Sequence, residues 1–204
     1  MLENKDYKFD IEALPLNWYY FGDRLKDTAE LIIKHSTYEV NRFPYFNAGK
    51  TLSDQFFLNY GFAIENVIKG YLISEDKNLT KGYFLSHDIS KNHDLVNLVK
   101  TIKKIQLTVQ DKKILKILSD CITFWGRYPI AKRSDVKFET LEYSEEIHFQ
   151  VKGLYFKFIK ALYDNIKDGW ENVNGLNSGT FRDSIFDDLS DVNNIEIESG
   201  NIKF

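Results

Sequence analysis

Three polar residues lie close together in a largely apolar stretch, FAIENVIKGYLI at positions 62–73. Glu65 and Lys69 are four residues apart with the acid first, and this order suits an ion pair on a helix. Asn66 is the third polar residue. A buried Glu65 would indicate a purpose, because a charged group removed from water is costly unless it is paired. The spacing fits an exposed pair at the edge of the apolar stripe equally well.

Two His-Asp pairs follow, His87-Asp88 and His93-Asp94, six residues apart. Histidine and aspartate together can bind a metal ion or transfer protons. A metal site needs three or four ligands, and these two pairs are the ones close in sequence. Because acids also favour the first turn of a helix, the pattern favours capping over metal binding. We therefore predict no metal and no other cofactor.

A third group is WGRYPIAKR at positions 125–133. Arg127 could clamp a phosphate with its planar guanidinium, and Tyr128 could stack on a base. Alternatively, Arg127 caps the last carbonyls of its own helix while Tyr128 covers the core.

Charge is unevenly distributed along the 204 residues, whose net charge is −3. Residues 170–204 contain seven acidic and two basic residues, so the remaining 169 carry +2. A lysine strip stands out, with Asp111 its one internal acid: Lys100, Lys103, Lys104, Lys112, Lys113 and Lys116. Such a strip can face phosphates, although a solvated helix face explains it as well.

Composition bounds the fold. Hydrophobic residues make up 43% of the chain, enough for a core, and the low counts of 11 glycines and 3 prolines favour long helices over a turn-rich β fold. The single cysteine, Cys121, excludes an internal disulfide, and its apolar neighbours favour a buried thiol. The acidic N-terminus does not resemble a signal peptide, and no apolar run is long enough to cross a membrane. We expect a cytoplasmic protein.

Apolar spacing of three and four residues predicts an all-α, up-and-down bundle. We expect five helices, at about 17–37, 53–75 with Ser53 as N-cap, 92–105, 110–125 and 144–168. Residues 1–15 are expected to form an irregular arm and 76–89 a loop. The predicted domain organisation is a helical bundle over residues 1–169, followed by an acidic, irregular extension over residues 170–204.

Several of these motifs together resemble the HEPN superfamily of prokaryotic helical domains. The resemblance covers about residues 17–168. It rests on FAIENVIKGYLI in the second helix, on His93-Asp94-Leu95 opening the third, and on Gly126-Arg127-Tyr128-Pro129 after the fourth. It implies a four- to five-helix bundle, often a homodimer. Many members are metal-independent endoribonucleases of toxin–antitoxin or phage-defence systems, and others bind RNA or nucleotides without cleaving them.

Cleaving members carry an arginine followed four to six residues later by histidine. Neither Arg127 nor Arg133 has a histidine in that range, so the resemblance implies an RNA- or nucleotide-binding protein with weak or no RNase activity. In any cleavage, Arg127 would stabilise the phosphorane charge and Glu65 or His93 would transfer protons. The residues expected to bind RNA or nucleotide are Asn66, Lys69, Tyr128, Lys100, Lys104 and Arg133.

A protein–protein interaction module with no nucleic-acid role is the alternative. In that case the contact patches would be aromatic, at Trp18, Tyr19 and Tyr20 and at Tyr45-Phe46. The acidic extension would then bind the lysine strip or a partner.

Overall fold

A computed structural model of the protein describes residues 5–39, 48–127 and 141–178. The named elements in these ranges are all helical, which confirms the all-α prediction. The long helices are α2 (Pro15–Glu39), α3 (Ala48–Glu75), α6 (Val109–Asp120) and α7 (Glu145–Ile166). The short elements are α1 (Lys5–Glu12), the 3₁₀ turn η1 (Lys77–Thr80), α4 (His87–Ser90), α5 (Leu95–Val99) and the π-helical turn η2 (Cys121–Trp125).

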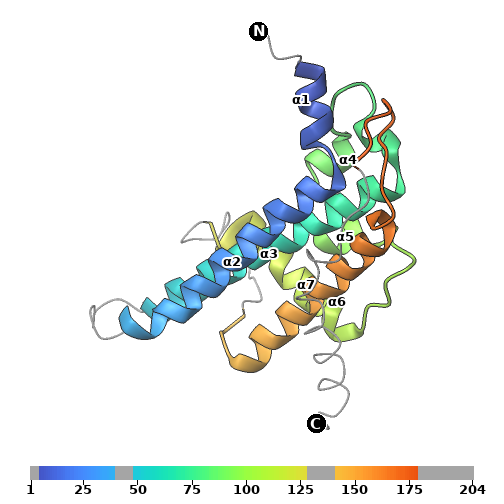
Figure 1. Ribbon diagram of the computed structural model, residues 1–204. Coiled ribbons are helices and arrows are strands. Elements are labelled where there is room, and N and C mark those ends of the chain that lie inside the picture. The colour runs from blue at the N-terminus through green and yellow to red at the C-terminus, as the bar shows by residue number, and fades with distance from the viewer. Residues whose placement is uncertain (1–4, 40–47, 128–140, 179–204) are drawn as a thin grey trace.

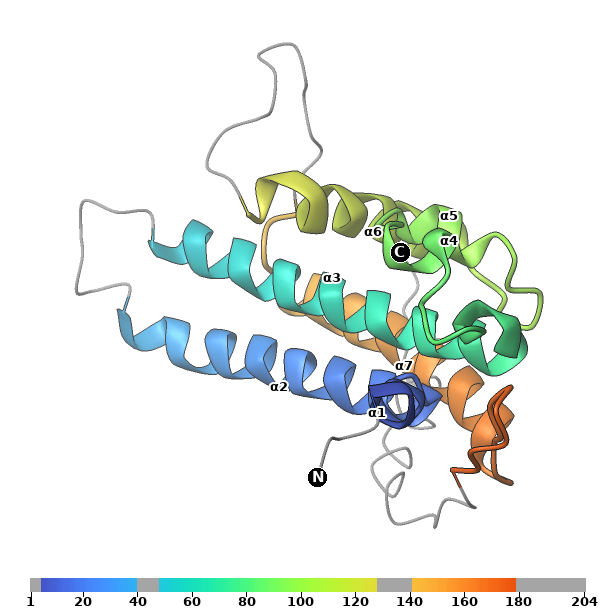
Figure 2. The same cartoon turned by 90° about the horizontal axis from the view of Figure 1, so that it is seen from above.

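Helix α3 occupies the centre of the bundle and contacts α2, α5, α6 and α7 (Figures 1 and 2). Glycines let α2 approach it closely. A Cβ atom on Gly70 would lie 2.8 Å from the Trp18 Cβ atom and 3.1 Å from the Pro15 carbonyl oxygen, and one on Gly22 would lie 3.0 Å from the Ala63 carbonyl oxygen. These pairings show that α2 runs antiparallel to α3.

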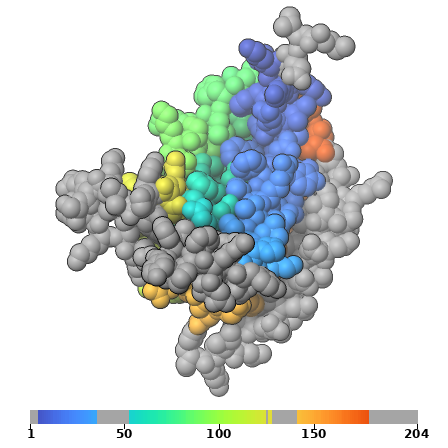
Figure 3. All heavy atoms as spheres, turned by 90° about the vertical axis from the view of Figure 1, so that its left-hand side faces the viewer, coloured from blue at the N-terminus to red at the C-terminus, as the bar shows by residue number. Residues whose placement is uncertain are grey.

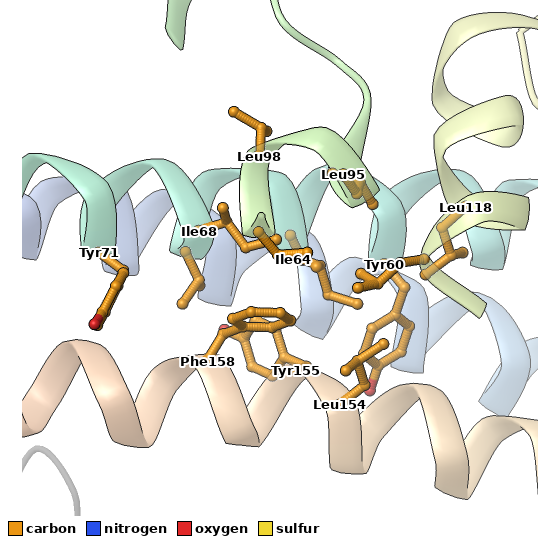
Figure 4. Packing of buried hydrophobic residues seen from close by; sticks show 14 of the residues in the cluster. Tyr60, Ile64, Ile68, Tyr71, Leu95, Leu98, Leu118, Leu154, Tyr155 and Phe158 are labelled. Carbon is orange, nitrogen blue, oxygen red and sulfur yellow. The ribbon is translucent and has the colours of Figure 1, made fainter. Parts of the chain in front are cut away.

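The core lies between α3 and the helices around it. Side chains of α3 pack against α5 and α6 on one side and against α7 on the other (Figure 4). The largest fully buried side chains of this core are aromatic: Phe56, Phe57, Tyr60, Tyr71, Tyr155 and Phe158, which are followed in size by isoleucines and leucine. None of the helices in the described ranges is both long and apolar enough to cross a membrane.

Four sequence predictions about helix bounds were wrong. The loop expected at 76–89 contains the 3₁₀ turn η1 and the start of α4. Residues 5–12 form α1 rather than an irregular arm, and the Asp10 carboxylate at its end accepts a hydrogen bond from Asn174 Nδ2 (2.9 Å). Helix α3 begins at Ala48, so Ser53 is a buried residue inside it and not its cap. The helix expected at 92–105 ends at Val99, although Ile102 still reaches the core from the irregular segment that follows.

Residues 170–178 pack on the bundle beyond the end of α7. The Trp170 ring is buried, and its Nε1–H donates to the Ser74 carbonyl at the end of α3 (3.2 Å). The residues from 179 onward, which contain most of the acidic extension, lie outside the described residues.

A hydrogen-bonded cluster joins α2, α3 and α7. The Glu30 carboxylate accepts hydrogen bonds from the Tyr60 hydroxyl and from His148 Nε2, the latter at 2.8 Å. On the other side of the imidazole ring, His148 Nδ1 lies 3.1 Å from the Tyr143 hydroxyl. Partial burial opposes ionisation of Glu30, but the two hydrogen bonds outweigh it and lower the pKa of this carboxyl group.

We predict that Glu30→Gln lowers the free energy of unfolding at pH 7 by about 1–2 kcal/mol, since the charged acceptor of both hydrogen bonds is lost. A carboxyl group whose pKa is lowered by folding stabilises the protein above its ordinary pKa of 4.5, and this contribution disappears as the pH falls through its pKa in the folded protein. Urea unfolding between pH 2 and 7 should therefore show a smaller loss on the acid side in the variant than in the wild type.

Glu12→Gln is the control, because Glu12 forms an exposed ion pair with Lys8 on α1. Exposed ion pairs of this kind contribute little to the free energy of unfolding. If both substitutions changed the free energy of unfolding equally at every pH, Glu30 would not be the stabilising acceptor of these two hydrogen bonds.

Candidate functional site

The polar residues of FAIENVIKGYLI lie on α3, and two of them are buried. Glu65 and Lys69 are each 4% exposed, and the Lys69 ammonium donates to Glu65 Oε1 at 2.5 Å. His93, from the segment between α4 and α5, places its Nδ1 atom 3.1 Å from both Glu65 oxygens. The structure thus selects the buried alternative for Glu65 and brings together three predicted site residues, which we call the Glu65–Lys69–His93 triad.

The contact with Glu65 determines which ring nitrogen of His93 carries a proton in the neutral side chain. A carboxylate can only accept hydrogen bonds, so Nδ1 carries the proton that faces Glu65. In the neutral ring the lone pair then resides on Nε2, on the opposite side. The His93 side chain is 43% exposed whereas those of Glu65 and Lys69 are 6% exposed. The arrangement presents a carboxylate-oriented imidazole at the surface, suited to accept or donate a proton or to bind a phosphate.

A groove lies near the triad, although Glu65, Lys69 and His93 do not line it themselves. It has a volume of about 770 Å³ and lies between the end of α3, α4 and α5. Leu72, one turn after Lys69, and Asn92, the neighbour of His93, both line it. The rest of its rim carries both signs of charge: Glu75, Asp76, His87, Asp88, Lys91 and Lys100.

The lysine strip begins at this groove. All six of its lysines are exposed, and they follow the segment after α5 and the first part of α6. Lys104 is held by Glu75 (2.8 Å) and Asn165 (2.9 Å), and its hydrogen bond lowers the pKa of Glu75. Lys116 is held by Asp120 (2.7 Å). Lys100, by contrast, contacts the neutral side chain of Asn97 (3.3 Å).

The other predicted site residues lie apart from the triad. Asn66 faces α2, and its amide donates to the Phe62 carbonyl (2.7 Å). Arg127 is exposed after η2, where the Gly126 carbonyl accepts a hydrogen bond from Gln55 (3.5 Å). Since a helix rises about 1.5 Å per residue, Gln55 lies about 15 Å along α3 from Glu65. Tyr128 and Arg133 lie outside the described residues.

The two aspartates of the His-Asp pairs are at helix starts, as the capping interpretation predicts. The Asp94 carboxylate caps α5 by accepting from the Asn97 amide (3.0 Å), and Asp88 lies in the first turn of α4. Cys121 is buried, and burial raises the pKa of its thiol, which keeps it protonated. Within the described ranges, no three His, Cys, Asp or Glu side chains are grouped as metal ligands would be.

Sequence reasoning missed the cluster around Glu30. Its members, Glu30, Tyr60, Tyr143 and His148, come from three segments far apart in the sequence, so no local spacing marks the whole cluster. The one sequence signal is an acid directly after Ala29, which belongs to the apolar face of α2.

Comparisons of the chain with models of protein families, with curated proteins and with solved structures found no match. The resemblance to HEPN proteins therefore rests on the sequence motifs alone.

We predict that Lys69→Met lowers the free energy of unfolding by about 3–5 kcal/mol, because it leaves the Glu65 carboxylate buried without its main partner. The double variant Glu65→Leu/Lys69→Met should recover most of this loss, since no unpaired charge remains. Both values can be measured by urea unfolding at pH 7.

The matched control is Lys160→Met, which breaks an exposed pair of the same spacing with Asp164 on α7. Its cost should stay below about 1 kcal/mol. If Lys69→Met costs no more than this control, the triad is not a buried charge cluster.

Proposed function

We propose that the protein is a HEPN-like RNA- or nucleotide-binding protein of the cytoplasm that does not cleave RNA efficiently. The observation that carries the proposal is the Glu65–Lys69–His93 triad, which holds an exposed imidazole beside a groove. The lysine strip begins at Lys100 on the rim of that groove. An RNA strand whose phosphates follow the strip would bring a nucleotide to His93.

The position of Arg127 supports binding over cleavage. Phosphodiester cleavage by 2′-hydroxyl attack needs a proton-transfer group and a cation at the charged transition state. His93 can supply the first, but Arg127 follows Gly126, whose carbonyl bonds to Gln55, about 15 Å along α3 from Glu65. A defence or toxin–antitoxin role for such a binder is part of the proposal and follows from the resemblance.

Binding should depend strongly on salt. Three lysines of the strip, Lys100, Lys103 and Lys112, have no acidic partner among the described residues. Three phosphate contacts to a single strand predict about a 20-fold loss of affinity between 50 and 200 mM salt. We expect this in fluorescence anisotropy with a labelled RNA of mixed sequence. Lys103→Gln/Lys112→Gln should flatten the salt dependence, whereas Lys34→Gln on α2 should not.

The same samples test cleavage in EDTA. We expect intact RNA with wild type, His93→Gln and Arg127→Ala, and His35→Gln serves as the histidine control. Metal-independent cleavage lost in His93→Gln but kept in His35→Gln would replace the binding proposal by an RNase. Absence of RNA and nucleotide binding at 50 mM salt would refute both.

The second candidate function is a protein–protein interaction module, favoured by the exposed apolar side chains of α1 and α2. Tyr7 (57%), Phe21 (56%) and Leu31 (55%) are more than half exposed, and these two helices run along one side of the molecule (Figure 3). Of the predicted patch, Tyr20 is exposed, Trp18 and Tyr19 pack partly against the core, and Tyr45-Phe46 lie outside the described residues.

If this face joins two copies of the chain, Phe21→Ser/Leu31→Ser should convert a dimer to a monomer in light scattering and leave the thermal midpoint of the monomer unchanged. Val109→Ser on α6 is the control, because Val109 is 87% exposed on another helix. A wild type that is monomeric at all concentrations would exclude the homodimer.

A further inference from the structure

A second cavity is lined by residues of α5, of the first turn of α6 and of the segment that joins these helices. It has a volume of about 440 Å³, within the range of roughly 300–1,000 Å³ of small-molecule sites. Its wall is aliphatic and is formed by Val96, Val99, Ile102, Ile105 and Leu107. The remaining lining residues are two lysines, Lys100 and Lys112.

The wall restricts the chemistry of an occupant. Among the described side chains that line the cavity, only the two lysines can form hydrogen bonds. A nucleobase placed there would find no side-chain hydrogen-bond acceptor and only the two lysines as side-chain donors for its edge, and unpaired polar groups are costly. Among the described residues that line the cavity, none offers an aromatic ring on which a base could stack. A saturated hydrocarbon chain has neither requirement.

The two lysines supply the complementary charge. Both are exposed, so their methylene stems can extend the apolar wall while the ammonium groups stay in water. The Lys100 ammonium contacts only the neutral Asn97 amide oxygen at 3.3 Å among described residues, and Lys112 has no acidic partner there. An anion at the mouth of the cavity would thus meet two cations without displacing an ion pair.

We propose that this α5–α6 cavity binds a medium-chain acyl carboxylate, with the chain against the aliphatic wall and the carboxylate between Lys100 and Lys112. The site is separate from the triad and does not rest on the proposed RNA binding. No covalent step is involved.

The first test is a chain-length series of hexanoate, octanoate and decanoate, titrated below their micelle concentrations by calorimetry. Each methylene buried is worth about 0.8 kcal/mol, so the dissociation constant should fall about fourfold per carbon until the cavity is filled. Decanol should bind at least fivefold more weakly than decanoate. Equal affinity for decanol, or no dependence on chain length, would overturn the proposal.

The second test locates the ligand. In a methyl-labelled sample, decanoate should shift the NMR signals of Val96, Val99 and Leu107 and leave those of Val151 and Ile159 in the core on α7 unchanged. Shifts spread over the whole protein would indicate detergent-like binding and overturn the proposal. An RNA oligonucleotide that moves these cavity signals when decanoate does not would assign the cavity to nucleic acid instead.

Two variants complete the test. Ile105→Trp should fill the cavity and abolish decanoate binding, whereas Val109→Trp, at an exposed position just beyond it, should not. Circular dichroism is used to check whether both variants fold. If Ile105→Trp does not fold, Lys100→Gln/Lys112→Gln decides the question: at least a fivefold loss for decanoate with no change for decanol supports the site, and an unchanged decanoate affinity overturns it.

Discussion

The burial of α3 by other helices constrains the rest of the structure. A helix covered by α2, α5, α6 and α7 has little surface on which to leave a charge in water, so a charged side chain on its buried faces needs a paired group close by. The Tyr60 hydroxyl donates a hydrogen bond to Glu30 of α2, and Glu65 is hydrogen-bonded to Lys69 and His93. These partners also set where the neighbouring segments lie against α3. The candidate site is thus a consequence of how a central helix is kept neutral.

Much of the fold could be predicted from the sequence, because long amphipathic helices repeat their apolar residues over many turns. The predicted helices at 17–37 and 144–168 agree with α2 and α7 to within about two residues at each end. Short helices were harder to predict from the spacing of apolar residues. In the segment after Val99, Ile102 keeps a helical spacing from Leu98 and Val99 but reaches the core from irregular backbone, so periodicity alone overextended α5. Helix α1 is joined to the segment after α7 by the hydrogen bond between Asp10 and Asn174, a contact that no local pattern reveals.

The site was only partly predictable for a similar reason. The spacing of Glu65 and Lys69 is the same for an exposed and for a buried ion pair, and the tertiary structure alone decides between them. The link from Glu65 to His93 spans 28 residues and depends on the path of the chain through α4. The sequence motifs predict one site for Arg127 and this group, but Arg127 follows η2, which lies near Gln55 on α3, ten residues before Glu65. For the cluster around Glu30, the one local signal was the acid that follows Ala29.

The order of the helices along the chain has a consequence for synthesis. About 70 residues separate the end of α3 from the start of α7, the helix that covers one of its apolar faces. At about 5–20 residues per second, a ribosome needs roughly 4–14 s to make this stretch. During that time the α2–α3 hairpin is complete, but Tyr71 and its neighbours on α3 lack the covering that α7 later provides. The nascent chain therefore passes through a stage with an exposed aromatic surface, of the kind that chaperones bind.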